Sequence, residues 1–387
     1  MSSNYAKRGV SAGKEEVHAA ISHLDKGLYP RAFCKILPDL STGDPDWCSI
    51  MHADGAGTKS ALAYLYWKET GDLSVWRGIA QDAIVMNTDD MLCAGATGPF
   101  IFSNTIGRNK FYVGGEVLSE MLQGMEEFFE MLRSHGVGVT NAGGETADVG
   151  DIVKTLIHDA TAFTRLPRKQ VITNEGIRAG DVIVGLASFG QTIYEKEYNG
   201  GIGSNGLTNA RHDLLSHVYA EKYPETFDSH IPSDLVYSGK YLVTDQVDSM
   251  PIPVGKALLS PTRTFLPVMK PVLDRYRDKI HGLIHCTGGG QSKVKKFIDQ
   301  VHVVKSNLFP TPPLFSLIQQ SSGASWAEMY EVLNMGHRME IYTDEETAKA
   351  IIDIAGSFEL GARIVGVCHP SDHPKVTVEG EETVVFG

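Results

Sequence analysis

The stretch that most constrains how this chain can fold is the run from His52 to Ser60, which reads His-Ala-Asp-Gly-Ala-Gly-Thr-Lys-Ser. An apolar, strand-like run (48–51) precedes it, and a helix-like run (61–66) follows it. This order predicts a mixed α/β fold in which an acid, two glycines, a hydroxyl and a lysine lie where a strand ends. Such strand ends are common ligand sites.

The residue types in this stretch suit phosphate chemistry. Asp54 can hold a hard cation, Gly55 and Gly57 let the backbone approach a ligand, and Lys59 can neutralise phosphate charge. The stretch is not a Walker A loop, because the G-x-x-x-x-G-K spacing is missing. Taken alone, a polar turn is the better interpretation of so short a motif, so the rest of the chain has to decide.

Composition narrows the class of protein. Hydrophobic residues make up 42% and charged residues 21% of the 387 residues, as in ordinary globular proteins. The net charge of −12 argues against a general nucleic-acid or membrane-surface binder, although a local cation can still attract a phosphorylated ligand. The five cysteines are scattered without a C-x-x-C pair, so we expect reduced thiols in a cytoplasmic protein, with neither a zinc site nor a disulfide framework. The polar start and the absence of a long apolar run predict neither a secretory signal nor a membrane span.

Hydrophobic periodicity divides the chain into two halves with a loosely similar order of strand, glycine turn and helix. A basic, loop-like linker near 166–182 places the predicted boundary between a domain at 1–168 and a domain at 169–387. Capping boxes are predicted at 325–328 and 343–346, and a second glycine-rich turn at 141–146. Helices are predicted at 14–28, 75–97, 116–135, 208–221, 264–278, 312–321, 326–333 and 345–356, and strands at 153–163, 182–187, 282–286, 338–342 and 363–368.

Acids in apolar surroundings indicate a metal site in the first half. Asp82 and Asp89 or Asp90 are two turns apart, so they share a face of the predicted helix 75–97. A buried acid is costly unless it is paired or bound to a metal. Asp54, Asp90 and Glu145, the last in the second glycine-rich turn, together offer the oxygen ligands that suit Mg²⁺. N-capping is the alternative that we retain for Asp89.

A second group of polar residues lies in the other half. Ser204 and Asn205 stand in a turn that leads into a helix, and Arg263 follows a proline turn and suits a phosphate contact. His285 ends a predicted strand just before Gly288–Gly290, whose amides could cradle an anion. The alternatives are a structural histidine and an arginine in a surface salt bridge.

Together, these motifs resemble those of the phosphoribosylformylglycinamidine cyclo-ligase family, the aminoimidazole ribonucleotide synthetases. Each motif is weak, but seven in this order are specific for the superfamily, and the last four favour the cyclo-ligases. The matching motifs are D-G-x-G-T-K at 54–59, D-x-x-x-M-x-x-(N)-D at 82–90, G-G-E-T-A at 143–147, S-N-G at 204–206, L-L-x-P-T-R at 258–263, H-x-T-G-G-G at 285–290 and N-M-G at 334–336.

The resemblance implies a two-domain, PurM-like α/β fold with mixed sheets, and a homodimer in which the N-terminal sheets join. It implies ATP and Mg²⁺ in a cleft between the domains. The implied reaction, a step of purine biosynthesis, is the ATP-dependent cyclisation of formylglycinamidine ribonucleotide to aminoimidazole ribonucleotide with release of ADP and phosphate. The enzyme would be a C–N bond-forming ligase.

Matched positions imply a role for each site residue. The implied catalytic residues are Asp90, His285 and Lys59, and the implied metal ligands are Asp54, Asp90 and Glu145. The implied ATP-binding residues are Asp54, Gly55, Gly57, Thr58, Lys59, Gly143, Gly144 and Glu145. The implied substrate residues are Ser204, Asn205, Arg263, Gly288, Gly289 and Gly290.

The chain departs from the family pattern in four places. Ser11 stands where an acid is usual, Asp89 replaces an asparagine, the loop before Ser204 is longer and carries 194–198, and Gln291-Ser292-Lys293 replaces Leu-x-Glu-Asn. These departures affect the substrate side more than ATP binding. Two alternatives therefore stay open: another ATP-dependent phosphotransferase of the superfamily, or a non-catalytic ATP-binding regulator with this fold.

Overall fold

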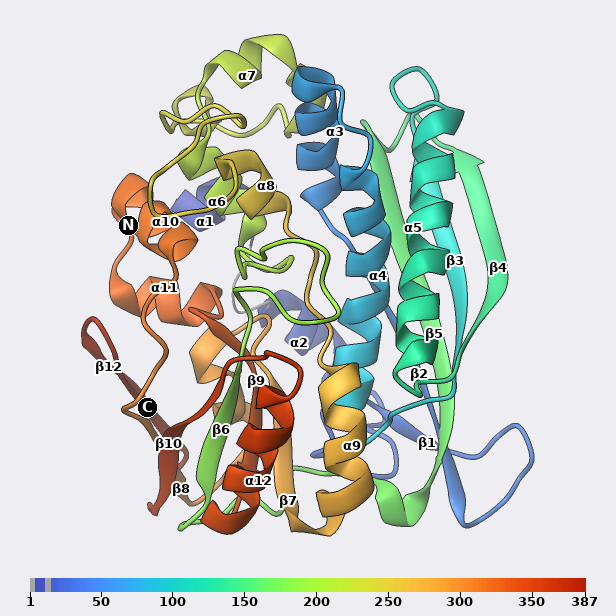
Figure 1. The fold of residues 1–387 in the computed structure, drawn as a ribbon, viewed down its shortest axis with the longest axis vertical. Helices are drawn as coiled ribbons and strands as arrows, with labels where there is room; N and C mark the ends of the chain where they lie inside the picture. The colour runs from blue at the N-terminus through green and yellow to red at the C-terminus, as the bar shows by residue number, and fades with distance from the viewer. Residues whose placement is uncertain (1–3, 11–14) are drawn as a thin grey trace.

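The computed structural model describes residues 4–10 and 15–387, which form two β-sheets with helices packed against them (Figure 1). Two short helices, α1 (Asn4–Lys7) and α2 (Glu15–Ile21), open the described chain, so the predicted helix at 14–28 is shorter than expected. The departure at Ser11 lies outside the described residues. The predicted fold class, α/β with two mixed sheets, is confirmed.

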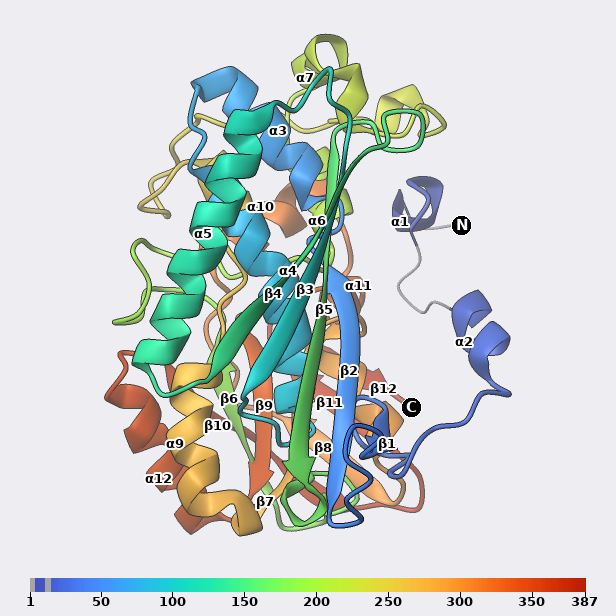
Figure 2. The ribbon, with the colours of Figure 1, turned by 90° about the vertical axis from the view of Figure 1, so that its right-hand side faces the viewer.

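The first sheet has the order β1-β2-β5-β3-β4, with β3 and β4 parallel and the other neighbours antiparallel. Its strands are β1 (Ile36–Pro38), β2 (Trp47–Gly55), β3 (Phe100–Arg108), β4 (Val139–Asp148) and β5 (Leu156–Pro167). Helices α3 (Lys59–Thr70), α4 (Val75–Leu92) and α5 (Gly115–Ser134) lie on one side of it (Figures 1 and 2). Residues of β5 alternate between buried and more exposed positions, as expected when helices cover only one face.

The second sheet has the order β12-β11-β8-β10-β6-β9-β7. Its strands are β6 (Val182–Ala187), β7 (Ile280–His285), β8 (Val301–Lys305), β9 (His337–Thr343), β10 (Ala362–Pro370), β11 (Lys375–Glu379) and β12 (Thr383–Phe386). The helices of this half are α6 (Leu207–Leu214), α7 (Val218–Lys222), α8 (Val254–Leu259), α9 (Leu266–Tyr276), α10 (Pro313–Ser322), α11 (Trp326–Val332) and α12 (Glu345–Gly356). The predicted boundary at 168/169 lies between the two sheets and stays a prediction, because one hydrophobic core runs through both halves.

Several local predictions were wrong for identifiable reasons. The glycine-rich segment 141–146 is part of β4, because it pairs with β3 along the sheet edge. The single helix predicted at 208–221 is split into α6 and α7, since Leu215 and Ser216 pair with Tyr241 and Gly239. Ser325 caps α11 as predicted by accepting from the Glu328 N–H, whereas Asp344 rather than Thr343 caps α12. In the part of the chain that is described, no helix is long and apolar enough to cross a membrane.

Helix α4 lies between the two halves, and its acids join them (Figure 1). Asp82 is fully buried and accepts hydrogen bonds from Lys59 Nζ at 2.9 Å and from the Thr262 backbone N–H at 2.7 Å. Asp89, two turns on, lies 3.2 Å from Arg338 Nη2 and accepts from the Phe265 N–H. The predicted shared face of Asp82 and Asp89 is therefore confirmed, and it faces the second half of the chain.

Removing one partner of the buried Asp82–Lys59 pair should destabilise the fold strongly. We expect Asp82→Ala to lower the free energy of unfolding by about 3–5 kcal/mol, because the Lys59 ammonium would be left buried without a counter-charge. Asp274→Ala is the matched control, since Asp274 pairs with Lys270 on the exposed side of α9. Its cost should stay below about 0.5 kcal/mol. Urea unfolding of both variants measures the difference, and equal losses would contradict this account of α4.

Candidate functional site

The stretch from His52 to Ser60 contains a shorter turn than its sequence predicts. Strand β2 runs through Gly55 and α3 begins at Lys59, so only residues 56–58 form the turn. Gly55 is required by packing, because a Cβ there would lie 1.8 Å from Asp159 Oδ1 in the neighbouring strand. Gly57 differs: its φ is +58° and no atom lies within 4 Å of the position of an added Cβ. The open side of this turn is therefore at Gly57 and Thr58.

Segments of the second half meet this turn. Thr58 Oγ1 lies 2.8 Å from Thr208 Oγ1, at the start of α6. A Cβ on Gly288 would lie 3.8 Å from Asn205 Nδ2, and Ser204 Oγ lies 3.4 Å from Thr262 Oγ1. The structure thus brings the predicted 54–58, 204–208 and 285–290 segments to one place between the halves.

The structure also brings Asp90 and His285 together, although they come from different halves. His285 is buried at the end of β7, and its Nδ1 lies 2.6 Å from Asp90 Oδ1. Burial lowers the pKa of His285 to about 4, while Asp90 opposes the shift. Burial alone would raise the pKa of Asp90, but contacts with His285 and His52 hold it below its ordinary value. The geometry assigns a neutral His285 that donates from Nδ1 to an ionised Asp90.

Two predicted phosphate contacts are already engaged within the protein. Lys59 is 1% exposed, and its ammonium donates to Asp82 and to the Ser260 carbonyl at 2.6 Å. Arg263 is 2% exposed and forms a bidentate pair with Glu195, through Nε at 2.9 Å and Nη2 at 2.6 Å. Its remaining donors bond backbone carbonyls at 187–190. In this arrangement both cations hold the fold, so their predicted roles toward ATP and substrate stay predictions that this geometry does not favour.

Glu145, the third predicted metal ligand, does not lie close to Asp54 and Asp90 within one chain. Asp54 pairs with Ala160 of β5, whereas Glu145 lies on the edge strand β4, three strands from β2, or about 14 Å across the sheet. Glu145 also pairs with Thr105 on the exposed face of the sheet, while Asp54 shares the helix-covered face with Ala160. Gly143 and Gly144, the neighbours of Glu145, lie on the same edge strand.

Within the described ranges, one set of side chains lies close enough to share a metal ion, and it is a different one: Cys286, His337 and Glu340. Glu340 there already pairs with the buried Lys305 ammonium, so this set behaves as a structural network. The predicted cluster of Asp54, Asp90 and Glu145 does not form in a single chain.

Sequence reasoning missed His52 and Asn87. His52 Nδ1 lies 3.0 Å from Asn87 Oδ1, and its Nε2 lies 3.4 Å from Asp90 Oδ2. A signal was present, because residues two apart in a strand share a face, which places His52 on the same side as Asp54. Arg338, which contacts Asp89, stands in the fully buried strand β9 beside His337 and Glu340, and no local pattern distinguishes it from them.

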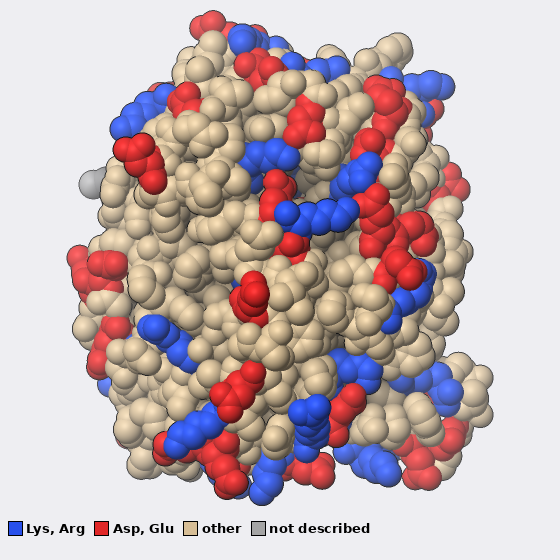
Figure 3. Space-filling view, in the orientation of Figure 1, with Lys and Arg blue, Asp and Glu red and all other residues tan. Residues whose placement is uncertain are grey.

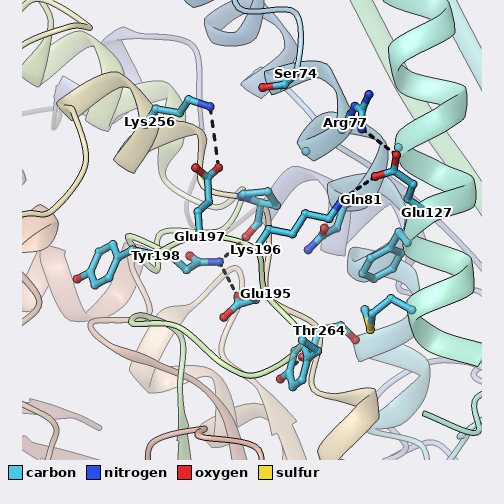
Figure 4. Close-up of a pocket in the computed structure, with 17 residues that line it drawn as sticks. Ser74, Arg77, Gln81, Glu127, Glu195, Lys196, Glu197, Tyr198, Lys256 and Thr264 are labelled. Carbon is cyan, nitrogen blue, oxygen red and sulfur yellow. Dashed lines mark hydrogen bonds and ion pairs between the residues drawn. The ribbon is translucent and has the colours of Figure 1, made fainter. Parts of the chain in front are cut away.

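A separate hollow lies between α4, α5 and the loop 190–199 (Figure 4). It measures about 390 Å³, and Lys196 reaches across it to Glu127 at 2.7 Å. Figure 3 shows basic and acidic side chains interspersed on this face of the molecule. Gln81, which lines the hollow, is nine positions before Asp90, or two and a half turns of helix, so the two point to opposite sides of α4.

Comparisons with known proteins agree with the motif pattern. Residues 34–165 match the family model for AIR synthase related protein, N-terminal domain. Over 324 residues the chain is 29% identical to a phosphoribosylformylglycinamidine cyclo-ligase from Methanocaldococcus jannaschii, covering 83% of this chain and 78% of that protein. Over 347 residues it is 28% identical to the enzyme of the same name from Methanococcus vannielii, covering 88% and 83%.

Solved structures share the fold at low sequence identity. A HypE–HypF complex matches with a TM-score of 0.59 and 15% identity, over 97% of this chain and 98% of that one. T. maritima PurL complexed with ATP matches with a TM-score of 0.50 and 13% identity, over 89% of this chain and 44% of PurL. The resemblance drawn from the motifs is confirmed: residues 34–165 match the AIR synthase related N-terminal domain, and most of the chain is similar to proteins named phosphoribosylformylglycinamidine cyclo-ligase.

Proposed function

We propose that this chain is a cytoplasmic cyclo-ligase that uses ATP to convert formylglycinamidine ribonucleotide into aminoimidazole ribonucleotide, ADP and phosphate. The observation that carries the proposal is the meeting of the Asp54–Thr58, Ser204–Thr208 and His285–Gly290 segments between the two halves. These are the segments whose motifs match the cyclo-ligases, and the proteins of that name are similar over most of the chain.

The chemistry needs a phosphoryl transfer followed by ring closure. An amide oxygen is a poor leaving group, so ATP phosphorylates it, and it then departs as phosphate when the amidine nitrogen attacks the same carbon. Catalysis of such a transfer consists mainly of positioning and charge neutralisation. We assign nucleotide binding to the turn at Gly57 and Thr58, whose open side meets the second half. We assign substrate binding to Ser204, Asn205 and the glycines 288–290.

Ring closure releases a proton from the attacking nitrogen, and we assign its acceptance to His285. Nε2 of His285 is buried and, among the described residues, has no hydrogen-bond partner, so its lone pair is not engaged. The Phe33 ring lies 6.4 Å from the imidazole and stacks on Phe297. Because His285 is fully buried, a substrate reaches Nε2 only after neighbouring side chains move. Asp90 keeps the proton of His285 on Nδ1 and so leaves Nε2 as the base.

Mg²⁺ would accompany the nucleotide and neutralise phosphate charge. The described residues offer no preformed cluster of three carboxylates for it, because Glu145 lies on the other face of the sheet. The donor set that fits is Asp54 at the end of β2, completed by phosphate oxygens and water, since Mg²⁺ in nucleotide sites is often held by one or two carboxylates.

A homodimer joined through the first sheet forms part of the proposal. The sheet face away from α4 and α5 exposes Met51 (64%), Ile101 (46%) and Ile157 (39%), and the edge strand β4 beside it is largely exposed (Figure 2). Exposed apolar residues on one open sheet face are typical of an interaction surface. Glu145 would lie at or near this interface.

The decisive assay mixes purified protein with ATP, Mg²⁺ and formylglycinamidine ribonucleotide. We expect aminoimidazole ribonucleotide and ADP in equal amounts, and we expect Asp90→Asn to lower kcat by about 10- to 100-fold, because His285 loses its orienting carboxylate. Asp274→Asn on the exposed side of α9 should leave kcat unchanged. Mass spectrometry of the products provides the readout.

Three other results would contradict the cyclo-ligase assignment. The absence of aminoimidazole ribonucleotide with wild-type protein would exclude it directly. ADP release with a different acceptor would indicate another phosphotransferase of the superfamily. Nucleotide binding without turnover of any acceptor would indicate a regulator.

The dimer can be tested independently of activity. We expect Met51→Lys combined with Ile101→Lys to convert a dimer into a monomer, because two buried charges at the sheet face would lose their hydration. Light scattering after gel filtration measures the mass. Leu122→Lys is the matched control, since Leu122 is an exposed apolar residue (50%) on α5. A monomeric wild type, or a double variant that remains dimeric, would overturn this arrangement.

A further inference from the structure

One carboxylate, that of Asp90, lies between two imidazoles that come from different parts of the fold. His285 Nδ1, at the end of β7, lies 2.6 Å from Oδ1, and His52 Nε2, in β2, lies 3.4 Å from Oδ2. The Asp90 side chain is 15% exposed, and His285 is fully buried. Each oxygen of Asp90 therefore already faces a nitrogen of the protein.

Asn87 fixes the orientation of His52. Its Nδ2 donates to the backbone carbonyls of Ala83 at 2.8 Å and Ala160 at 3.0 Å, and a third carbonyl, that of Asp54, lies at 3.2 Å. With the amide nitrogen directed at carbonyls, Asn87 Oδ1 has to act as an acceptor, so His52 donates to it from Nδ1. The ring is thereby held with Nε2 toward Asp90.

This geometry does not fit a magnesium ligand. Mg²⁺ demands oxygen ligands at about 2.1 Å in near-octahedral geometry. The Nδ1–H of His285 already occupies a lone pair of Asp90 Oδ1, and the His52 ring stands against Oδ2. Glu145, the predicted co-ligand, lies on the opposite face of the first sheet.

We propose that Asp90 is a positioning residue that orients His285, with His52 and Asn87 holding Asp90 in turn, and that it does not ligate Mg²⁺. The proposal rests on the proposed function for its catalytic consequence only. His52 acts through Asp90, so it is a positioning residue as well. His52, Asp90 and His285 also join β2 and α4 of the first half to β7 of the second half. This junction lies where the nucleotide and substrate segments meet.

The first test measures metal-dependent nucleotide binding, which does not require turnover. Isothermal titration with Mg²⁺ and ADP should give affinities within threefold of wild type for Asp90→Asn and for His52→Phe. Asp54→Asn, at the carboxylate that we assign to the metal, should weaken Mg²⁺-dependent binding by about 10-fold or more. A loss of 10-fold or more for Asp90→Asn, with binding of metal-free ADP unchanged, would overturn the proposal.

The second test observes the histidine itself. In nitrogen-15 NMR of histidine-labelled protein, with His285→Gln used for assignment, His285 should be the tautomer protonated at Nδ1. Asp90→Asn should shift it toward the other tautomer or a mixture, and His52→Phe should shift it partly in the same direction. An unchanged tautomer in Asp90→Asn would overturn the orienting role even if the protein proves to act on a different substrate.

Kinetics complete the test once a turnover assay exists. His52→Phe should lower kcat by about 10- to 100-fold while the KM for ATP stays within twofold, and His52→Gln should restore part of the loss. His52→Phe combined with Asp90→Asn should be no slower than Asp90→Asn alone, because the two residues act as one unit. Wild-type kcat in His52→Phe, or additive losses in the double variant, would contradict the proposal.

Discussion

Burial of carboxylates on a single helix governs how this molecule is assembled. Removing a carboxylate from water costs several kcal/mol unless it gains partners, so each acid of α4 has to find them. Asp82 bonds Lys59 and Thr262, Asp89 contacts Arg338, and Asp90 bonds His285. Most of these partners come from the second half of the chain. The helix therefore sets where the second half docks, and the candidate site lies along that junction.

The same constraint separates residues that hold the junction from residues that face a ligand. Lys59 and Arg263 carry charges that suit phosphate, yet both are buried and paired. Gly57 and Thr58 are exposed, Asn205 is half-buried, and all three lie where the two halves of the chain meet. The departure at Gln291 is structural too, since its side chain is buried and bonds the Asn334 carbonyl. The parts of the motifs left open to a ligand are short, uncharged turns.

Much of the fold could be predicted because its signals are local. Strand β6 and helix α12 have the predicted bounds, since periodicity and flanking turns mark both ends. The glycine-rich strand β4 was taken for a turn, because its pairing with β3 is not visible in its own residues. The ordered motifs identified the segments that converge at the site. Roles within those segments were harder to predict, since Arg263 pairs with Glu195, 68 positions away. Strand alternation alone places His52 on the same face as Asp54, so that part could have been predicted. Its contact with Asp90 could not, because it depends on how β2 packs against α4.

The central claim is that nucleotide binds where the β2–α3 turn meets the 204–208 and 285–290 segments. A crystal structure of the protein with Mg²⁺ and a non-hydrolysable ATP analogue tests this most directly. We predict phosphate density beside Gly57 and Thr58, with the metal contacting Asp54 and with Asp90 still bonded to His285. Nucleotide density in the hollow between α4, α5 and the loop 190–199, or a metal ion bound to Asp90, would contradict it.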